Sequence, residues 1–273
     1  VMRQGGVKLV EVGTTNRTYL ADYEDAVTER TAALMRVHSS NFRLVGFVHE
    51  TSLEDLVDAG RRHDIPVLDD LGSGCFLDTA AFGLDPEPTV QQSVAAGAGL
   101  VFFSGDKLVG GPQAGIIVGH RHLVDRLKKH PLARALRIDK TRLAALSATL
   151  VHYLRGEATG KIPVWRMIAA PRDDIDRRAR EWAAVLGEAA SIIDGESMVG
   201  GGSLPGGTLP TRLVSLASVK GKRGGVQALA AALRRQSPPV IGRIDNDALL
   251  LDPRSVLPEE DPVVIRALRN LTV

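Results

Sequence analysis

A short apolar run passes directly into a glycine-rich turn that holds one lysine. The run is Gly99–Phe103, and the turn is Ser104-Gly105-Asp106-Lys107-Leu108-Val109-Gly110-Gly111-Pro112-Gln113-Ala114. Such a run is typical of a buried strand, and glycine lets the backbone approach a flat ring closely. A lysine at this position suits a Schiff base with an aldehyde cofactor, with Asp106 able to hold its ammonium group beforehand. The alternative is a surface turn whose lysine is merely solvated.

A second apolar run ends in two carboxylates and another glycine-rich turn, Ile65-Pro66-Val67-Leu68-Asp69-Asp70-Leu71-Gly72-Ser73-Gly74. Open α/β sheets bind ligands at the carboxyl ends of their strands. A carboxylate there can pair with the pyridinium nitrogen of pyridoxal phosphate and keep the ring able to accept electrons. Consecutive strand side chains point to opposite faces, so we favour Asp70 over Asp69 because it lies nearer the strand end. The alternative is an aspartate that caps a helix or turn.

Composition narrows the class of protein. The chain has 273 residues, 34 basic and 32 acidic side chains, and a net charge of +2, which gives no overall electrostatic case for nucleic acid. It contains neither a run of eighteen apolar residues nor an apolar signal core near its start, so we expect a cytoplasmic protein without a membrane span. The single cysteine, Cys75, excludes an internal disulfide and a multi-cysteine metal site. We interpret it as a packed side chain, with a nucleophile as the alternative.

The order of apolar runs predicts an α/β fold with a second, smaller lobe. In the first half we expect strands at 32–37, 44–48, 65–70, 99–103 and 114–119, the last antiparallel to its predecessor, and helices from Thr51, at 90–96, 122–130 and 140–155. Glycines and prolines between Gly156 and Pro171 mark a boundary. Beyond it we expect helices at 172–188, 226–235 and 262–269, a strand at 212–216, a hairpin of 240–244 with 248–251, and a flexible glycine-rich loop at 200–207. The predicted domains are therefore 1–160 and 161–273.

Three further groups are candidates for binding. Arg134 and Arg137 are three residues apart, so that on a helix both guanidinium groups could bind one oxyanion. The alternative, which the residues alone favour, is a solvated helix end. The loop Glu11–Thr18 is polar and without apolar period, and its Thr15, Asn16 and Arg17 are candidate substrate ligands. His38 comes at an expected strand end and is the histidine that we place near the chemistry.

Taken together, these motifs resemble the bacterial selenocysteine synthase family, the L-seryl-tRNA(Sec) selenium transferases. The resemblance covers nearly the whole chain and is carried by the segments 11–18, 70–74, 87–90, 104–115, 131–140 and 238–244. The lysine segment and the segment 131–140 distinguish this family within the wider aspartate-aminotransferase-like class. Members normally begin with a tRNA-contacting domain and an early part of the cofactor domain, neither of which precedes Val1, so we expect a fragment whose activity alone is in question.

The resemblance implies an aspartate-aminotransferase-like (fold type I) α/β domain that binds pyridoxal 5'-phosphate, followed by a smaller C-terminal α+β domain. It implies that Lys107 is the aldimine lysine, that Asp106 is an active-site acid and that Asp70 is the pyridinium partner. Ser73, Ser104 and His38 are the other expected cofactor-binding residues, and Arg134 and Arg137 the expected binders of a phosphate-like selenium donor.

The implied reaction converts seryl-tRNA(Sec) to selenocysteyl-tRNA(Sec) by loss of hydroxide and addition of selenium from selenophosphate. The implied partners are tRNA(Sec) charged with serine and further copies of the chain, in a dimer-based oligomer that the family suggests is a decamer. Two alternatives remain open at this stage: a related pyridoxal-phosphate lyase or transferase acting on a small amino acid or amino sugar, and a non-enzymatic assembly or RNA-binding subunit.

Overall fold

The computed structural model describes residues 2–217 and 225–271, and the chain divides into two compact units. Unit 1 comprises Val1–Ala81, Asp85–Tyr153 and Gly200–Gly206, and unit 2 comprises Phe82–Leu84, Leu154–Val199 and Gly207–Val273. The main change of unit, between Tyr153 and Leu154, precedes the boundary placed at residue 160 from the sequence. The return of Gly200–Gly206 to unit 1 has no counterpart in the sequence pattern.

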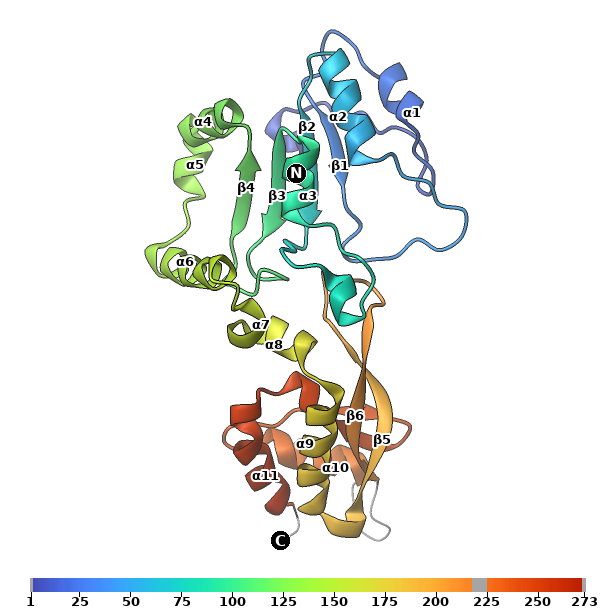
Figure 1. The fold of residues 1–273 in the computed structure, drawn as a ribbon, viewed down its shortest axis with the longest axis vertical. Helices are drawn as coiled ribbons and strands as arrows, with labels where there is room; N and C mark the ends of the chain where they lie inside the picture. The colour runs from blue at the N-terminus through green and yellow to red at the C-terminus, as the bar shows by residue number, and fades with distance from the viewer. Residues whose placement is uncertain (1, 218–224, 272–273) are drawn as a thin grey trace. The chain divides into compact units, whose positions relative to one another are not determined.

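Unit 1 is built on a four-stranded sheet with strand order β1-β2-β3-β4 (Figure 1). The strands are β1 Leu34–Val37, β2 Val67–Gly72, β3 Leu100–Ser104 and β4 Gly115–Gly119. The first three run parallel, and β4 pairs antiparallel with β3, as the sequence predicted. Because parallel strands share one direction, the carboxyl ends of β1, β2 and β3 lie at the same edge of the sheet.

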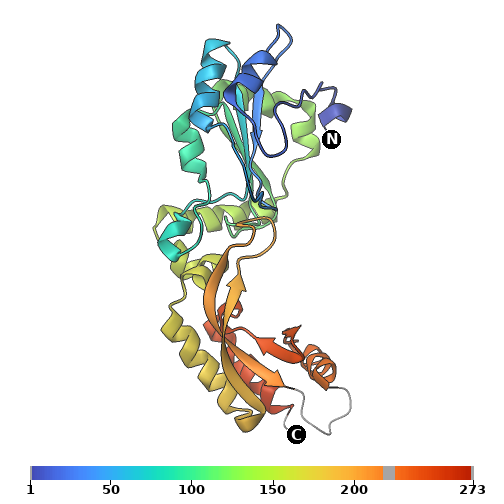
Figure 2. The ribbon, with the colours of Figure 1, turned by 90° about the vertical axis from the view of Figure 1, so that its right-hand side faces the viewer.

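Helices α2 Leu53–Arg62 and α3 Val90–Ala96 lie along one face of this sheet (Figure 2). The hydroxyl of Ser52 caps α2 by accepting a hydrogen bond of 3.0 Å from the amide of Asp55, and α3 starts with a capping box between Thr89 and Gln92. The apolar side chains of α2 then pack into the core, where Leu56 is fully buried. The other helices of this part of the chain are α1 Leu20–Asp25, α4 Arg121–Lys129, α5 Pro131–Ala135 and α6 Lys140–Leu154, with 3-10 turns η1 Met2–Gly5 and η2 Thr79–Phe82.

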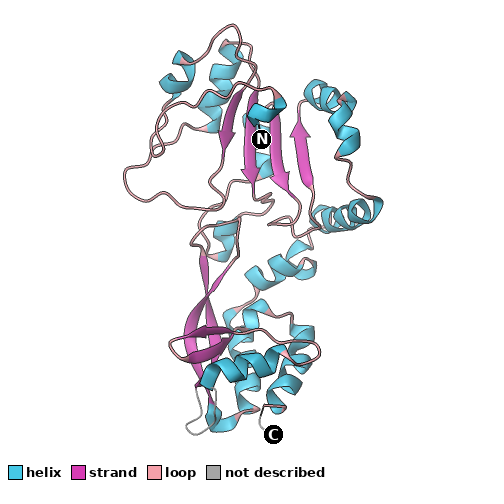
Figure 3. Cartoon of the chain, turned by 180° about the vertical axis from the view of Figure 1, so that it is seen from behind, coloured by secondary structure: helices cyan, strands magenta, loops and turns pink. Residues whose placement is uncertain are grey.

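Unit 2 is an α+β unit around an antiparallel sheet of order β5-β6-β8-β7 (Figure 3). Its strands are β5 Ala190–Met198, β6 Thr208–Ala217, β7 Arg243–Asp245 and β8 Ala248–Leu251. Its helices are α7 Ala158–Lys161, α8 Pro163–Ala169, α9 Arg172–Ala184, α10 Gly225–Arg234 and α11 Asp261–Arg269. Three 3-10 turns complete the unit: η3 Gly187–Ala189, η4 Pro253–Ser255 and η5 Pro258–Glu260. The core packs Trp182 of α9 and Leu268 of α11 with Leu249 of β8. No helix in 2–217 or 225–271 is long and apolar enough to cross a membrane.

One predicted strand is absent, and one observed strand was not predicted. Residues 44–48 form no strand, and the side chains of Val45 and Phe47 are 90% and 83% exposed. The carbonyl of Phe47 instead accepts a hydrogen bond of 2.9 Å from the side-chain amide of Asn16, so this segment is held by side chains without a sheet neighbour. Conversely, β5 was missed because its polar residues, among them Asp194 and Glu196, hide the strand alternation, and its long pairing with β6 stabilises it instead.

Candidate active site

The lysine turn and the Asp70 turn meet at the carboxyl edge of the unit 1 sheet. The amide of Leu108 donates a hydrogen bond of 3.0 Å to the carbonyl of Ser73, which joins the two turns directly. The amides of Gly105 and Gly111 close the lysine turn through bonds of 2.8 Å to the carbonyls of Ala114 and Gly105. The loops after β2 and β3 are therefore fixed to each other through their backbones, before any ligand binds.

Lys107 is half-buried and extends back toward the end of β2. Gly72 has a φ of +65°, and a Cβ atom there would lie 3.6 Å from Nζ of Lys107 and 2.9 Å from Oγ of Ser40. Ser40 is buried in the loop after β1, and sequence reasoning missed it because only its neighbour His38 stood at an expected strand end. No residue in 2–217 or 225–271, Asp106 included, forms an ion pair with Lys107, and Asp106 is exposed. The expected hold of Asp106 on the ammonium group is therefore not seen.

Asp70 and Asp69 have different surroundings because β2 alternates. Asp69 is fully buried, and its carboxylate accepts hydrogen bonds from Nε of Arg36 at 2.8 Å and from the hydroxyl of Ser93 at 2.6 Å. Asp70 points to the opposite face, is half-buried, and accepts a hydrogen bond of 3.2 Å from the amide of Gly72. Within the described ranges no basic side chain pairs with Asp70. Asp69 is thus used by the fold, while Asp70 is free to meet a positively charged ring nitrogen.

The other expected cofactor ligands lie on the same three loops. Ser73 is fully buried and its hydroxyl has no hydrogen-bond partner, which is costly unless a bound molecule supplies one. Ser104 ends β3 opposite Gly115. His38 follows β1, donates its amide to the carbonyl of Asp70 at 2.8 Å, and places Nε2 3.4 Å from Oε1 of the buried Glu87. The two atoms are close enough for an ion pair if His38 is protonated, but neither forms a hydrogen bond, and the sequence did not reveal that they lie together.

The glycine-rich loop Gly200–Gly206 also belongs to this region. A Cβ atom at Gly202 would lie 3.0 Å from Cε and 3.3 Å from Nζ of Lys107, so the loop backbone lines the lysine side chain. Ser203 and Leu204 are 4% and 5% exposed, and the hydroxyl of Ser203 has no partner. The sequence predicted a flexible loop here. The missed signal is a small-residue run that permits close approach to another side chain.

The predicted substrate loop is held by bonds to the segment around Phe47. Asn16 and Arg17 both donate to the carbonyl of Phe47, at 2.9 and 3.4 Å, and Arg17 lies over the Phe47 ring at 5.8 Å. An isolated parallel bridge joins Arg17 to His49. Thr15 is exposed. No hydrogen bond or ion pair in the described part connects these residues with Lys107, and their role toward a substrate stays a prediction.

Arg134 and Arg137 are exposed and form no ion pair within the described ranges. Arg134 lies in α5, while Arg137 comes after that helix has ended, so the two do not share a helical face as expected. The short helix ends because Leu136 leaves the helical conformation. Figure 1 shows α5 beside the edge strand β4. Nothing in the described structure brings either arginine into contact with Lys107, and both remain candidates for an anion.

Cys75 is packed, as the sequence indicated. Its side chain is fully buried, burial raises the pKa of the thiol to about 12, and Sγ donates to the carbonyl of Leu77 at 3.0 Å. At pH 8 only about one molecule in ten thousand would carry the thiolate that reacts. We expect a thiol-specific reagent at pH 8 to leave Cys75 unmodified in the native protein and to modify it fully in denaturant. Rapid labelling of the native protein would contradict this assignment.

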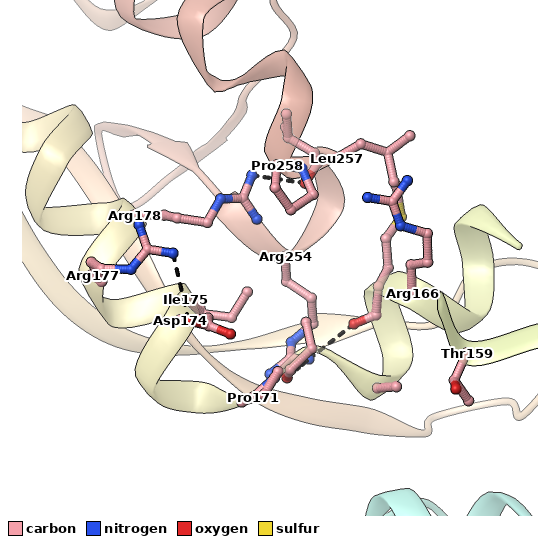
Figure 4. Close-up of a pocket in the computed structure, with 14 residues that line it drawn as sticks. Thr159, Arg166, Pro171, Asp174, Ile175, Arg177, Arg178, Arg254, Leu257 and Pro258 are labelled. Atoms are coloured by element: carbon pink, nitrogen blue, oxygen red, sulfur yellow. Dashed lines mark hydrogen bonds and ion pairs between the residues drawn. The ribbon is translucent and has the colours of Figure 1, made fainter. Parts of the chain in front are cut away.

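Unit 2 holds a separate cavity of about 230 Å³ in which several arginines meet (Figure 4). Arg178 donates to Asp261 and to the carbonyls of Pro253 and Val256, and Arg254 donates to the carbonyl of Met167. These bonds join α8 and α9 to the segment that follows β8. None of the site residues expected from the sequence lines this cavity, and its buried Arg178 and Arg254 serve the packing of unit 2.

The carboxyl edge of the unit 1 sheet has the components that a pyridine aldehyde cofactor requires. Lys107 offers an amine without an ionic partner in the described residues, Asp70 an uncompensated carboxylate, and Ser73 a buried hydroxyl without a partner. The missing side chain at Gly72 leaves space beside Nζ. These groups fit pyridoxal phosphate, because the cofactor needs an amine for its aldehyde and an acid for its ring nitrogen.

Comparison with known proteins identifies the family. The sequence profile of the L-seryl-tRNA selenium transferases matches residues 1–257. The L-seryl-tRNA(Sec) selenium transferase of Nitratidesulfovibrio vulgaris is 51% identical over 99% of this chain and 58% of its own length, and that of Geobacter sulfurreducens is 49% identical over 99% and 60%. The chain therefore spans about three fifths of the curated relatives it matches.

A solved structure supports the architecture. The structure of D-glucosaminate-6-phosphate ammonia-lyase superposes with a TM-score of 0.59 at 22% identity, covering 99% of this chain and 65% of that one, which is a likeness of fold alone. The predicted α/β class is confirmed by the parallel strands β1, β2 and β3 of unit 1 with the helices packed on them, and this likeness of fold agrees with it. With a matching profile over almost all of its residues and relatives at half identity, the chain belongs to the L-seryl-tRNA selenium transferase family.

Proposed function

We propose that the enzyme containing this chain converts seryl-tRNA(Sec) to selenocysteyl-tRNA(Sec) with pyridoxal 5'-phosphate and a phosphate-like selenium donor. The observation that carries the proposal is the junction of the Lys107 and Asp70 turns at one sheet edge, in a chain of this family. The bound cofactor would supply an electron sink for negative charge at Cα of the seryl group.

The residues of the chain take definite parts in this reaction. Nζ of Lys107 would hold the cofactor and, once displaced by the amino group of the seryl ester, remove the proton from Cα. The carboxylate of Asp70 would keep the ring nitrogen protonated, since it has no other cationic partner in the described structure. Hydroxide would then leave Cβ and, with the proton taken from Cα, be lost as water. Selenium of the donor would form the new bond to Cβ while a proton returns to Cα, and water would cleave the selenium–phosphorus bond to release phosphate.

The test is direct conversion of labelled substrate. The enzyme loaded with pyridoxal phosphate should turn tRNA(Sec) carrying labelled serine into tRNA carrying labelled selenocysteine, but only when selenophosphate is present. The second candidate, a lyase on a small amino acid or amino sugar, has a structural neighbour of that kind, yet the 22% identity supports its fold alone. Release of free ammonia from a small amino acid, with no change in seryl-tRNA, would favour that candidate.

Arg134 and Arg137 are proposed to bind the anionic selenium donor, because both guanidinium groups are exposed and unpaired in the described structure. Replacing either by lysine should lower donor-dependent kcat/KM by roughly thirty- to a thousandfold, equivalent to about 2–4 kcal/mol, because a point charge cannot reproduce the planar fork. Single-turnover kinetics would follow loss of hydroxide and addition of selenium separately.

The matched control for this experiment is Arg142→Lys, whose guanidinium is already paired with Asp139 at 2.9 Å and which should behave as the unmodified enzyme. The Arg134 and Arg137 variants could instead slow hydroxide loss alone, or slow hydroxide loss and selenium addition equally. Either result would mean that these arginines bind the cofactor or the tRNA ester and not the selenium donor.

A further inference from the structure

The loop Gly200–Gly206 contacts the proposed catalytic lysine from a distant part of the sequence. Gly202 has no side chain, and any side chain at this position would meet Lys107. A Cβ atom there would be 3.0 Å from Cε, 3.3 Å from Nζ and 3.4 Å from Cδ of Lys107. Distances of 3.0–3.4 Å are shorter than ordinary packing contacts, so a side chain at position 202 would displace the side chain of Lys107. The absence of a side chain at Gly202 therefore leaves the space that the lysine occupies.

The backbone of this loop has an unfavourable conformation next to Gly202. Gly202 has a φ of +84°, which glycine tolerates, but Leu204 has a φ of +48°, a left-handed value that is unusual for a side chain of this kind. Leu204 and Ser203 are nonetheless buried. Backbone strain of this sort persists where packing over-determines it, and it gathers at ligand sites.

Ser203 adds an observation that points to a ligand. Its side chain is 4% exposed and its hydroxyl has no hydrogen-bond partner. Ser73, beside the lysine turn, is buried with the same unmet hydroxyl. A buried hydroxyl without a partner destabilises the folded protein, and the arrangement is explained when a bound molecule provides the missing bond.

We propose that the loop Gly200–Gly206 forms a wall of the lysine site, in which the missing side chain at Gly202 leaves room for Lys107 and the hydroxyl of Ser203 hydrogen-bonds an oxygen of the molecule held there. That oxygen belongs either to the cofactor or to the seryl ester. The inference rests on the proposed function for the identity of these molecules. Ser203 is thus a positioning residue that sequence reasoning did not select.

The first test compares two glycines of the same loop in the enzyme containing this chain. Gly202→Ala and Gly206→Ala both place a side chain at positive φ, +84° and +77°, but a Cβ at Gly206 meets nothing within 4 Å. The strain is matched, and only the Gly202 variant crowds Lys107. We expect Gly202→Ala to weaken the apparent affinity for pyridoxal phosphate, measured by absorbance titration, by roughly tenfold or more. Gly206→Ala should stay within about twofold. Equal effects, or none in either variant, would overturn the role assigned to Gly202.

The second test removes the hydroxyl of Ser203. Ser203→Ala should leave the Tm of the cofactor-free protein unchanged or raised, because an unsatisfied group is lost, and should weaken ligand binding by about two- to tenfold. The matched control is Ser93→Ala, whose buried hydroxyl does have a partner, Asp69 at 2.6 Å, and which should lower that Tm. A Ser203→Ala variant with lowered Tm and unchanged affinities would show a structural role and overturn the proposal.

Two arms separate the sources of the oxygen. A changed dissociation constant for pyridoxal phosphate assigns the bond to the cofactor, while an unchanged constant with a raised KM for seryl-tRNA and unchanged kcat assigns it to the ester. The cofactor arm needs no tRNA. Pyridoxal phosphate could bind Lys107, with a dissociation constant that changes in the loop variants, while seryl-tRNA is not converted. That result would contradict the proposed function but would support the role of the loop as a wall of the lysine site.

Discussion

Replacing Lys107 by alanine in the enzyme containing this chain is expected to remove covalent attachment of pyridoxal phosphate and to lower turnover by at least about a thousandfold, because one amine both holds the cofactor and moves the Cα proton. The lysine is half-buried and has no ionic partner in the described residues, so its loss should leave the fold intact. Reduction of the loaded enzyme with borohydride, followed by peptide mapping, should find the pyridoxyl group on Lys107.

The control is Lys129→Ala at the exposed end of α4, which should keep both the label and the activity. A pyridoxyl group on any other lysine of the unmodified enzyme, or turnover in Lys107→Ala near that of the unmodified enzyme, would remove Lys107 from its proposed role.

The adjacent carboxylates of β2 should give opposite results when each is changed to asparagine. Asp70→Asn should retain the fold and reduce activity by roughly a hundredfold or more, because the ring nitrogen would lose the charge that keeps it protonated. Asp69→Asn should instead lower the free energy of unfolding by about 2–4 kcal/mol, since Arg36 would lose its ionic partner and the hydroxyl of Ser93 its charged acceptor. Urea denaturation and turnover, measured on both variants, separate the two effects.

Each variant serves as the control for the other. Wild-type turnover in Asp70→Asn would exclude Asp70 from the mechanism. A stability loss in Asp70→Asn as large as that in Asp69→Asn would mean that the two carboxylates share a structural role, contrary to their different partners.

Local sequence was sufficient where the physical signal is local. The apolar runs before Asp70 and Lys107 became β2 and β3, and Ser52 became the cap of α2, because strand burial and helix capping depend on neighbours within a few residues. Alternation along β2 also separated Asp69 from Asp70 before any partner was known. The segment 44–48 had the same apolar character yet formed no strand, since a strand also needs a neighbour that the sequence does not specify.

By itself, the sequence determined the α/β pattern, the two turns that carry Lys107 and Asp70, and membership of the family through its motifs. The tertiary structure alone decided which groups lie together: Asp69 accepts hydrogen bonds from Arg36 and Ser93, and His38 lies 3.4 Å from Glu87. It also brought Gly202 to Lys107 across about a hundred residues. Contacts between segments so far apart arise from the packing of whole elements, which leaves no periodic trace in the local sequence.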